Sequence, residues 1–125
     1  MFKDSNAVSG YSVDDLAAAK AFYQGTLGLD VTEQPEGLAL IVAGGGSVFL
    51  YPKENHEPAT FTVLNFPVDD IEAAVDELTG KGVTMERYEG FNHDARGIAD
   101  PGGALGPRIA WFKDPAGNII SVLQI

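Results

Sequence analysis

The sequence has no cysteine, few basic residues and no long hydrophobic run, and each shortage excludes a class of protein. Without cysteine, the chain can form no disulfide framework, no thiolate metal site and no cysteine nucleophile. Lysine and arginine number 8 against 18 aspartates and glutamates, and the resulting net charge of −10 repels polyanions, so we expect no nucleic-acid partner. No apolar run reaches the length of a membrane span, and residues 1–4 do not resemble the start of a secretory leader. We therefore expect a cytoplasmic protein without a membrane partner. Its acidity favours a cationic ligand, although acidity of this size also serves solubility.

The sequence does contain an internal repeat. Val13-Asp14-Asp15-Leu16 returns as Val68-Asp69-Asp70-Ile71, and Gly28-Leu29-Asp30-Val31 returns as Gly82-Val83-Thr84-Met85. At 125 residues and 45% hydrophobic content, the two copies must share one domain, 1–125. Each copy predicts a strand, a helix and then about three more strands.

The expected elements follow from apolar spacing. In the first module, 5–52, we expect a strand over 7–13, a helix from the Asp14-Asp15 pair to Leu27, and strands over 29–33, 38–43 and 47–52. A linker, 53–60, leads to the second module, 61–125, with a strand over 61–68, a helix carrying Ile71, Ala74, Val75 and Leu78, and strands over 83–89, 108–112 and 118–125. We interpret both aspartate pairs as helix caps rather than catalytic carboxylates, because a helix start needs acceptors there.

The long irregular stretch 90–107 holds the densest cluster of chemically able side chains. In it, His93 beside Asp94 can act as a base or ligand, or can be an ordinary exposed histidine. His56, in the linker, is interpreted as a solvated surface residue.

Three segments together resemble the vicinal oxygen chelate superfamily, which includes glyoxalase I, extradiol dioxygenases, fosfomycin-resistance enzymes and bleomycin-binding proteins. They are the run from Ala21-Phe22-Tyr23 to Leu27-Gly28-Leu29, the Val-Asp-Asp starts, and above all the run from Ala110-Trp111-Phe112 to Asp114-Pro115-Ala116-Gly117-Asn118. The resemblance implies an α+β fold in which two βαβββ modules form a curled, cup-like mixed sheet, with helices outside and ligand inside. It also implies a homodimer, and whether a cup closes within one chain or across the dimer stays open.

The resemblance further implies four metal-ligand positions, on the first and last strand of each module. These positions fall on Val8, Leu50, Val63 and Ser121, with an uncertainty of one place at Leu50. None offers the imidazole or carboxylate donors that such metals need. We therefore expect no metal and no other cofactor.

Strand alternation predicts what lines the cup instead. The inward positions are small or apolar and are Val8, Gly10 and Ser12; Val63, Asn65 and Pro67; and Ile119, Ser121 and Leu123. Leu50 adds a wall, or Phe49 and Tyr51 do so if the register is shifted by one. Trp111 and Ile109 share one face of their strand, and parity does not say whether that face points inward. The full set of candidate ligand-binding residues is Val8, Gly10, Leu50, Val63, Asn65, Phe91, His93, Arg96, Trp111 and Ser121.

Three functions remain in competition. The first is a binding protein of the bleomycin-resistance type that holds a small organic molecule without a catalytic metal. The second is a metal-free enzyme that uses the 90–107 loop as a lid, with His93 or Arg96 as its working group. The third is a metal-dependent lyase, transferase or dioxygenase. We favour them in that order and leave catalysis undecided.

Overall fold

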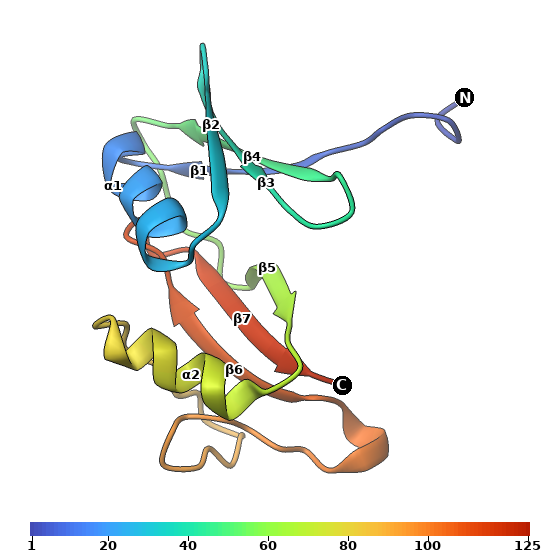
Figure 1. Cartoon of the computed structure of the whole chain (residues 1–125), viewed down its shortest axis with the longest axis vertical. Coiled ribbons are helices and arrows are strands. Elements are labelled where there is room, and N and C mark those ends of the chain that lie inside the picture. Colours follow the sequence, from blue (N-terminus) through green and yellow to red (C-terminus); the bar gives the residue numbers. More distant parts are fainter. The chain divides into compact units, whose positions relative to one another are not determined.

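In a computed structural model, the chain forms two compact units, Met1–Glu57 and Pro58–Ile125. The structure describes residues 1–102 and 104–125 in full, and Gly103 by its backbone alone. Each unit pairs a small mixed sheet with a helix on one of its faces (Figure 1). The predicted α+β class with two modules of strands is confirmed. The boundary between the units falls inside 53–60.

The first unit contains a four-stranded sheet in the order β1-β4-β3-β2, with β1 parallel to β4 and the other pairs antiparallel. Its elements are β1 (Ser9–Val13), α1 (Leu16–Lys20), the π-helical turn η1 (Ala21–Thr26), β2 (Asp30–Gln34), β3 (Gly37–Ile41) and β4 (Ser47–Pro52). The aspartate interpretation is confirmed here, because an Asp15 carboxylate oxygen accepts a hydrogen bond from the Ala18 N–H at 3.0 Å. The predicted helix reaches Leu27, but its second half is π-helical, with the Leu27 N–H donating to the Phe22 carbonyl.

The helix covers a buried apolar face of this sheet. Tyr11 on β1 and Tyr23 on η1 join their hydroxyl groups at 2.7 Å, and both rings are buried. Leu38 and Leu40 on β3 and Leu50 on β4 belong to the same core. Burial of such side chains contributes about 1.5–3 kcal/mol each, so this face accounts for much of the unit's stability.

Gly37 at the start of β3 is required by close approach of the neighbouring strand. A Cβ atom there would lie 2.0 Å from the Leu50 carbonyl oxygen and 3.0 Å from Cζ of Phe49. We expect Gly37→Ala to reduce the free energy of unfolding by about 1–3 kcal/mol, because the backbone must shift to admit the methyl group. Urea unfolding followed by circular dichroism measures this. The matched control is Gly25→Ala in the same unit, where no heavy atom lies within 4 Å of the added Cβ, and its stability should be unchanged or higher.

The second unit contains a three-stranded sheet in the order β5-β7-β6. Its elements are β5 (Thr62–Pro67), α2 (Ile71–Gly80), the 3-10 turn η2 (Gly103–Leu105), β6 (Arg108–Lys113) and β7 (Ile119–Gln124). Asp70 caps α2 as predicted, its carboxylate accepting from the Ala73 N–H at 3.1 Å. Of the helices described in either unit, none has the length and hydrophobicity needed to cross a membrane.

The predicted strand over 83–89 is wrong as a continuous element. Only Glu86 forms an isolated bridge, with Trp111 on β6. Beyond this bridge, the Tyr88 N–H donates to Nε2 of His93, at 3.0 Å, and not to a strand partner. The following stretch is irregular but packed, since Ile98 and Ala99 are buried and Ala99 bridges to Ile109.

The Asp-Pro-x-Gly-Asn segment is a tight turn between β6 and β7. The buried Asp114 carboxylate accepts hydrogen bonds from the N–H groups of Ala116 at 2.9 Å and Asn118 at 2.8 Å, and from the Asn118 side-chain amide at 3.0 Å. Gly117 adopts a φ of 84°, which favours glycine. The motif is therefore explained by the geometry of this turn.

Candidate ligand-binding face

One face of the second unit's sheet is not covered by α2. Ala110 and Phe112 on β6 are buried on the side that carries the helix, and the Glu72 carboxylate of α2 accepts a hydrogen bond from the Arg108 guanidinium. Successive side chains on a strand point to opposite faces, so Trp111 lies on the other face. The position of α2 therefore shows which face of β6 carries Trp111, a point that strand alternation alone left open. We call the uncovered side the open face. By strand pairing its members are Thr62, Asn65, Pro67, Ile109, Trp111, Lys113, Ile119, Ser121 and Leu123.

A short row of polar groups crosses the open face. Trp111 pairs with Ser121, which pairs with Asn65, and the Ser121 hydroxyl donates to the Asn65 side-chain oxygen at 2.5 Å. Ser121 is fully buried beneath its neighbours, whereas Asn65 is exposed. Asn65 and Ser121 therefore share one face of the sheet, as strand alternation predicted, and the Ser121 hydroxyl already donates its proton to Asn65.

Thr62 belongs to the open face and was not predicted. The indole N–H of Trp111 reaches across β7 and donates to the Thr62 hydroxyl at 3.2 Å. The pairing of β5 with β7 shifts between Thr62 and Leu64, which leaves Val63 as the extra residue of a bulge. Strict alternation from Val63 to Pro67 fails at that bulge, and no sequence signal marks it.

An aromatic cluster surrounds the Trp111 ring. The ring centroids of Tyr88, Phe91 and His93 lie 5.4, 5.1 and 6.0 Å from that of Trp111, with steep interplanar angles typical of edge-to-face packing. Phe91 remains 49% exposed, so its ring is available to a ligand. Tyr88 was missed because it lies in the run interpreted as a strand.

The hydroxyl of Tyr88 is buried and has no hydrogen-bond partner among the described residues. Burial raises the pKa of Tyr88, and the nearby Glu86 carboxylate acts in the same direction. The phenol therefore keeps its proton.

His93 cannot act as the base or ligand considered above while its hydrogen bonds persist. Its Nδ1 atom lies 2.7 Å from the Gly97 carbonyl oxygen, and its Nε2 atom accepts from the Tyr88 N–H. A carbonyl only accepts, so Nδ1 carries the proton and Nε2 has no free lone pair. Asp94 does not orient the ring either, because its carboxylate accepts from the N–H groups of Arg96 and Ile98.

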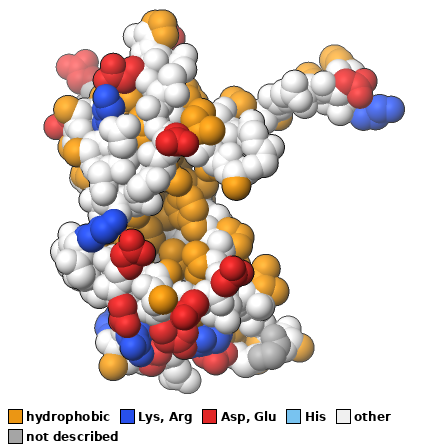
Figure 2. Space-filling model, viewed as in Figure 1, with side chains coloured by type: hydrophobic (Ala, Val, Ile, Leu, Met, Phe, Trp, Pro, Cys, Tyr) orange, Lys and Arg blue, Asp and Glu red, His pale blue; other side chains and the backbone are white. Residues whose placement is uncertain are grey.

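Arg96 is bound to α2 instead of facing a ligand. Its guanidinium Nε and Nη2 atoms contact the two carboxylate oxygens of Asp76 at 2.9 and 3.1 Å. This contact holds the pKa of Asp76 below its usual range and raises that of Arg96. Figure 2 shows acidic and basic side chains side by side over α2 and the loop that follows it. The predicted ligand contact of Arg96 is therefore not supported, because Asp76 draws it to the helix side of the sheet.

The first-unit candidates divide between two faces of their own sheet. Leu50 is fully buried and pairs with Tyr11, so it belongs to the core and not to a ligand wall. Gly10 pairs with Phe49 on the opposite face, which also carries Tyr51, and the centroids of these two stacked rings lie 6.2 Å apart. Gly10 therefore shares a face with Phe49 and Tyr51, as in the register shifted by one, and a ligand wall there stays a prediction. The sequence could not choose between the two registers.

Two further residues lie differently from their predicted places. Val8 precedes β1 in a segment that runs away from the sheet (Figure 1), and it is 64% exposed. His56 is half-buried, and its Nδ1 atom lies 2.7 Å from the Ser12 hydroxyl oxygen. The interpretation of His56 as a solvated side chain is therefore wrong.

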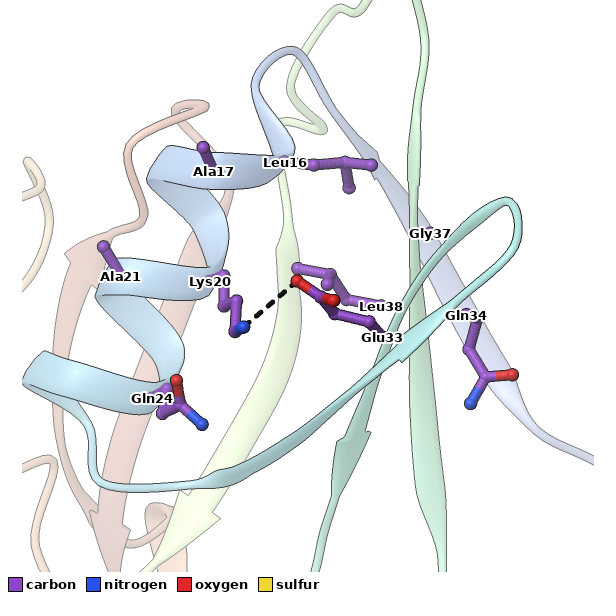
Figure 3. Close-up of a pocket in the computed structure, with 9 residues that line it drawn as sticks. All are labelled: Leu16, Ala17, Lys20, Ala21, Gln24, Glu33, Gln34, Gly37 and Leu38. Carbon is purple, nitrogen blue, oxygen red and sulfur yellow. Dashed lines mark hydrogen bonds and ion pairs between the residues drawn. The ribbon is translucent and has the colours of Figure 1, made fainter.

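A separate hollow of about 480 Å³ lies in the first unit between the helical segment and β2 and β3 (Figure 3). It is lined by Leu16, Ala17, Lys20, Ala21, Gln24, Glu33, Gln34, Gly37 and Leu38. Its charged groups neutralise each other, since the Lys20 ammonium contacts the Glu33 carboxylate at 3.1 Å. We assign it no ligand.

The four family metal positions do not fit a divalent ion. Val8 and Val63 have no donor, Leu50 lies in the core, and the Ser121 hydroxyl is bonded to Asn65. Within the described part of the chain, no three histidine, aspartate or glutamate side chains are grouped to hold a metal. These residues cannot supply the coordination that zinc or iron of this family requires.

Comparison with known proteins agrees with this fold. The family model described as Glyoxalase/Bleomycin resistance protein/Dioxygenase superfamily matches residues 7–122. The chain therefore belongs to this superfamily. Among curated proteins, no significant sequence relative was found.

Similar solved structures include an antibiotic binding protein. TnmS3 from Streptomyces sp. CB03234, described in those words, is 27% identical over 94% of each chain, with a TM-score of 0.64. The fosfomycin resistance protein FosX from Listeria monocytogenes is 14% identical over 95% of this chain and 91% of its own, with a TM-score of 0.69. An integron cassette protein from the Halifax Harbour sewage outfall metagenome is 21% identical over 94% of this chain and 96% of its own, with a TM-score of 0.70. The last two likenesses concern the fold alone.

Proposed function

We propose that the protein binds a small, largely apolar organic molecule with an aromatic part, and that it does so on the open face without a catalytic metal. The observation that carries the proposal is the aromatic cluster around Trp111 on a sheet face that the helix leaves uncovered. Aromatic and aliphatic walls with a few placed polar groups are typical of small-molecule sites. TnmS3, one of the similar structures, is described as an antibiotic binding protein, which supports the same class of ligand.

The polar groups of the open face suit orientation of a ligand rather than catalysis. Thr62 offers a hydroxyl oxygen and Asn65 offers an amide group. No base is paired with a nucleophile among these described groups, since both nitrogens of His93 are bonded to backbone. A metal-free enzyme that uses the 90–107 loop is therefore the weaker candidate, and a metal-dependent lyase, transferase or dioxygenase the weakest.

Charge favours a cationic ligand over an anionic one. The chain carries a net charge of −10, and the basic groups nearest the open face are paired, as Lys113 is with Glu86 at 3.5 Å. An acidic field raises the local concentration of cations and is weakened by salt. The homodimer and the cytoplasmic location stay predictions that accompany this proposal.

Native mass spectrometry of freshly purified protein tests the proposal directly. We expect twice the chain mass, a non-covalently bound organic molecule, and far less than one metal ion per chain after expression with added Zn, Ni, Mn or Fe. Stoichiometric metal together with lactoylglutathione formation or catechol cleavage would establish the metal-dependent alternative instead. A purely monomeric species would contradict the dimer and leave the ligand proposal intact.

The charge preference has its own matched probes. Proflavine and acridine-9-carboxylate share a planar tricyclic ring but carry opposite charges near neutral pH. Quenching of Trp111, the only tryptophan, reports binding of either compound. We expect proflavine to bind about tenfold more tightly at low salt, with the difference shrinking as salt is added. Equal affinities at every salt concentration would contradict a role for charge.

A further inference from the structure

His93 joins two points of the segment that carries the aromatic cluster. Its ring links the Tyr88 N–H on one side to the Gly97 carbonyl on the other, at 3.0 and 2.7 Å. Phe91 lies between these points, and its ring packs against both His93 and Trp111. A single imidazole therefore holds residues 88–97 in the shape that places Tyr88 and Phe91 against Trp111.

Both hydrogen bonds are satisfied only by the neutral ring with its proton on Nδ1. The Tyr88 N–H needs a lone pair at Nε2, and the Gly97 carbonyl needs a proton at Nδ1. A protonated ring would direct a second N–H at the Tyr88 N–H, so that bond would be lost. Imidazole is the side chain that ordinarily changes charge between about pH 5 and 8.

We propose that His93 is a pH-sensitive positioning residue, which in its neutral form holds residues 88–93 against Trp111 and on protonation releases them from the open face. The regulatory part of this inference rests on the proposed function, because it concerns access to the same ligand face. The clasp itself, His93 with its two backbone bonds, does not depend on any ligand.

The charged groups around His93 do not replace the lost bond. On its own segment, Asp94 is engaged by backbone N–H groups, and Arg87 donates to the carbonyls of Asp94 and Ala95 at 3.0 and 3.1 Å, which brings positive charge close by. Glu89 on this segment is exposed. Among the described residues, no carboxylate is hydrogen-bonded to the His93 ring.

The elements packed against the segment give the same result. On α2, the Asp76 carboxylate accepts hydrogen bonds from the Arg96 guanidinium. Beside β6, the Glu86 Oε1 atom lies 3.5 Å from the Lys113 Nζ atom. Tyr88 and Trp111 present neutral rings. The Trp111 ring attracts an imidazolium, but it offers no oxygen or nitrogen acceptor for the Tyr88 N–H or for the new Nε2–H of His93. The Arg96 contact keeps the later part of the loop on α2, so release is confined to residues 88–93.

The chain has one tryptophan and two histidines, so the fluorescence comes from Trp111 and a titration can be assigned by replacing each histidine in turn. Trp111 fluorescence of the ligand-free protein is recorded from about pH 8 to about pH 5, together with the amide nitrogen and proton shifts of Tyr88. We expect one transition with a shared midpoint in the parent protein. His93→Gln should abolish it, since the amide does not titrate, whereas the matched control His56→Gln should keep it.

Proflavine, whose charge is constant over this range, then tests the regulatory part by calorimetry. We expect its affinity in the parent to fall about tenfold between the two ends of the transition, and to change less than about twofold in His93→Gln. If proflavine binds equally at both ends, regulation is overturned while the proposed function stands. If the transition occurs but no aromatic compound binds at any pH, the proposed function fails and the clasp stands. A parent protein without a transition, or a transition that persists in His93→Gln, overturns the clasp; the Tyr88 amide reads this in the parent even where the variant fails to fold.

Discussion

Replacing Asp114 with alanine is expected to reduce the free energy of unfolding of the second unit by about 3–5 kcal/mol, the largest single effect on stability that we anticipate. The Asp114 carboxylate is buried and accepts hydrogen bonds from the Ala116 N–H, the Asn118 N–H and the Asn118 amide. Alanine would leave these donors without that acceptor at a site that water reaches poorly. Unfolding in urea, followed by the fluorescence of Trp111 in the same unit, measures the change.

Two variants bracket this expectation. Asp114→Asn keeps one acceptor oxygen and should lose about half as much stability. Asp70→Ala removes another aspartate of the second unit, an exposed cap with one hydrogen bond to Ala73, and should cost about 1 kcal/mol. If Asp114→Ala costs no more than Asp70→Ala, the turn is not the anchor that its hydrogen bonds indicate.

Replacing Trp111 with alanine is expected to weaken binding of proflavine at least thirtyfold, equivalent to about 2 kcal/mol. The indole is the centre of the aromatic cluster, and its N–H also holds the Thr62 hydroxyl across the sheet. Truncation removes the stacking surface and the packing that places Phe91. Because the variant loses the only tryptophan, isothermal titration calorimetry is the appropriate measurement.

The controls separate stacking from general loss of hydrophobic surface. Trp111→Phe keeps a ring and should lose only about threefold to fivefold in affinity. Leu105→Ala removes a side chain in the same unit that is 82% exposed and lies outside the open face, and it should bind like the parent. A Trp111→Ala variant that stays folded and binds proflavine as tightly as the parent would show that the site lies elsewhere.

Local sequence patterns account for much of the fold. The repeat predicts two modules, and Asp15 and Asp70 cap their helices as expected, because a cap involves residues only three apart. The Asp114 turn is equally local, with every bond described above formed within four residues. The absence of metal donors at Val63 and Ser121 also follows from residue identity alone.

Which faces the strands present was decided only in the tertiary structure. Alternation assigns Trp111 and Ala110 to opposite faces, but the position of α2 determines which face stays open. The bulge at Val63 breaks alternation without a local signal, because it reflects how β5 pairs with β7 far along the chain. The same reason explains the Leu50 register, which depends on its pairing with Tyr11.

The sequence by itself thus determined the repeat, the caps, the turn and the residue types at the four positions where the family places metal ligands, since each depends on near neighbours or on residue type. The tertiary structure decided the roles of the loop residues. Arg96 forms an ion pair with Asp76, twenty positions away. Both ring nitrogens of His93 are hydrogen-bonded to backbone groups whose positions a sequence does not give. Such contacts are chosen by the packing of the whole unit, because the free energy of one hydrogen bond is too small to specify its partner against the alternatives.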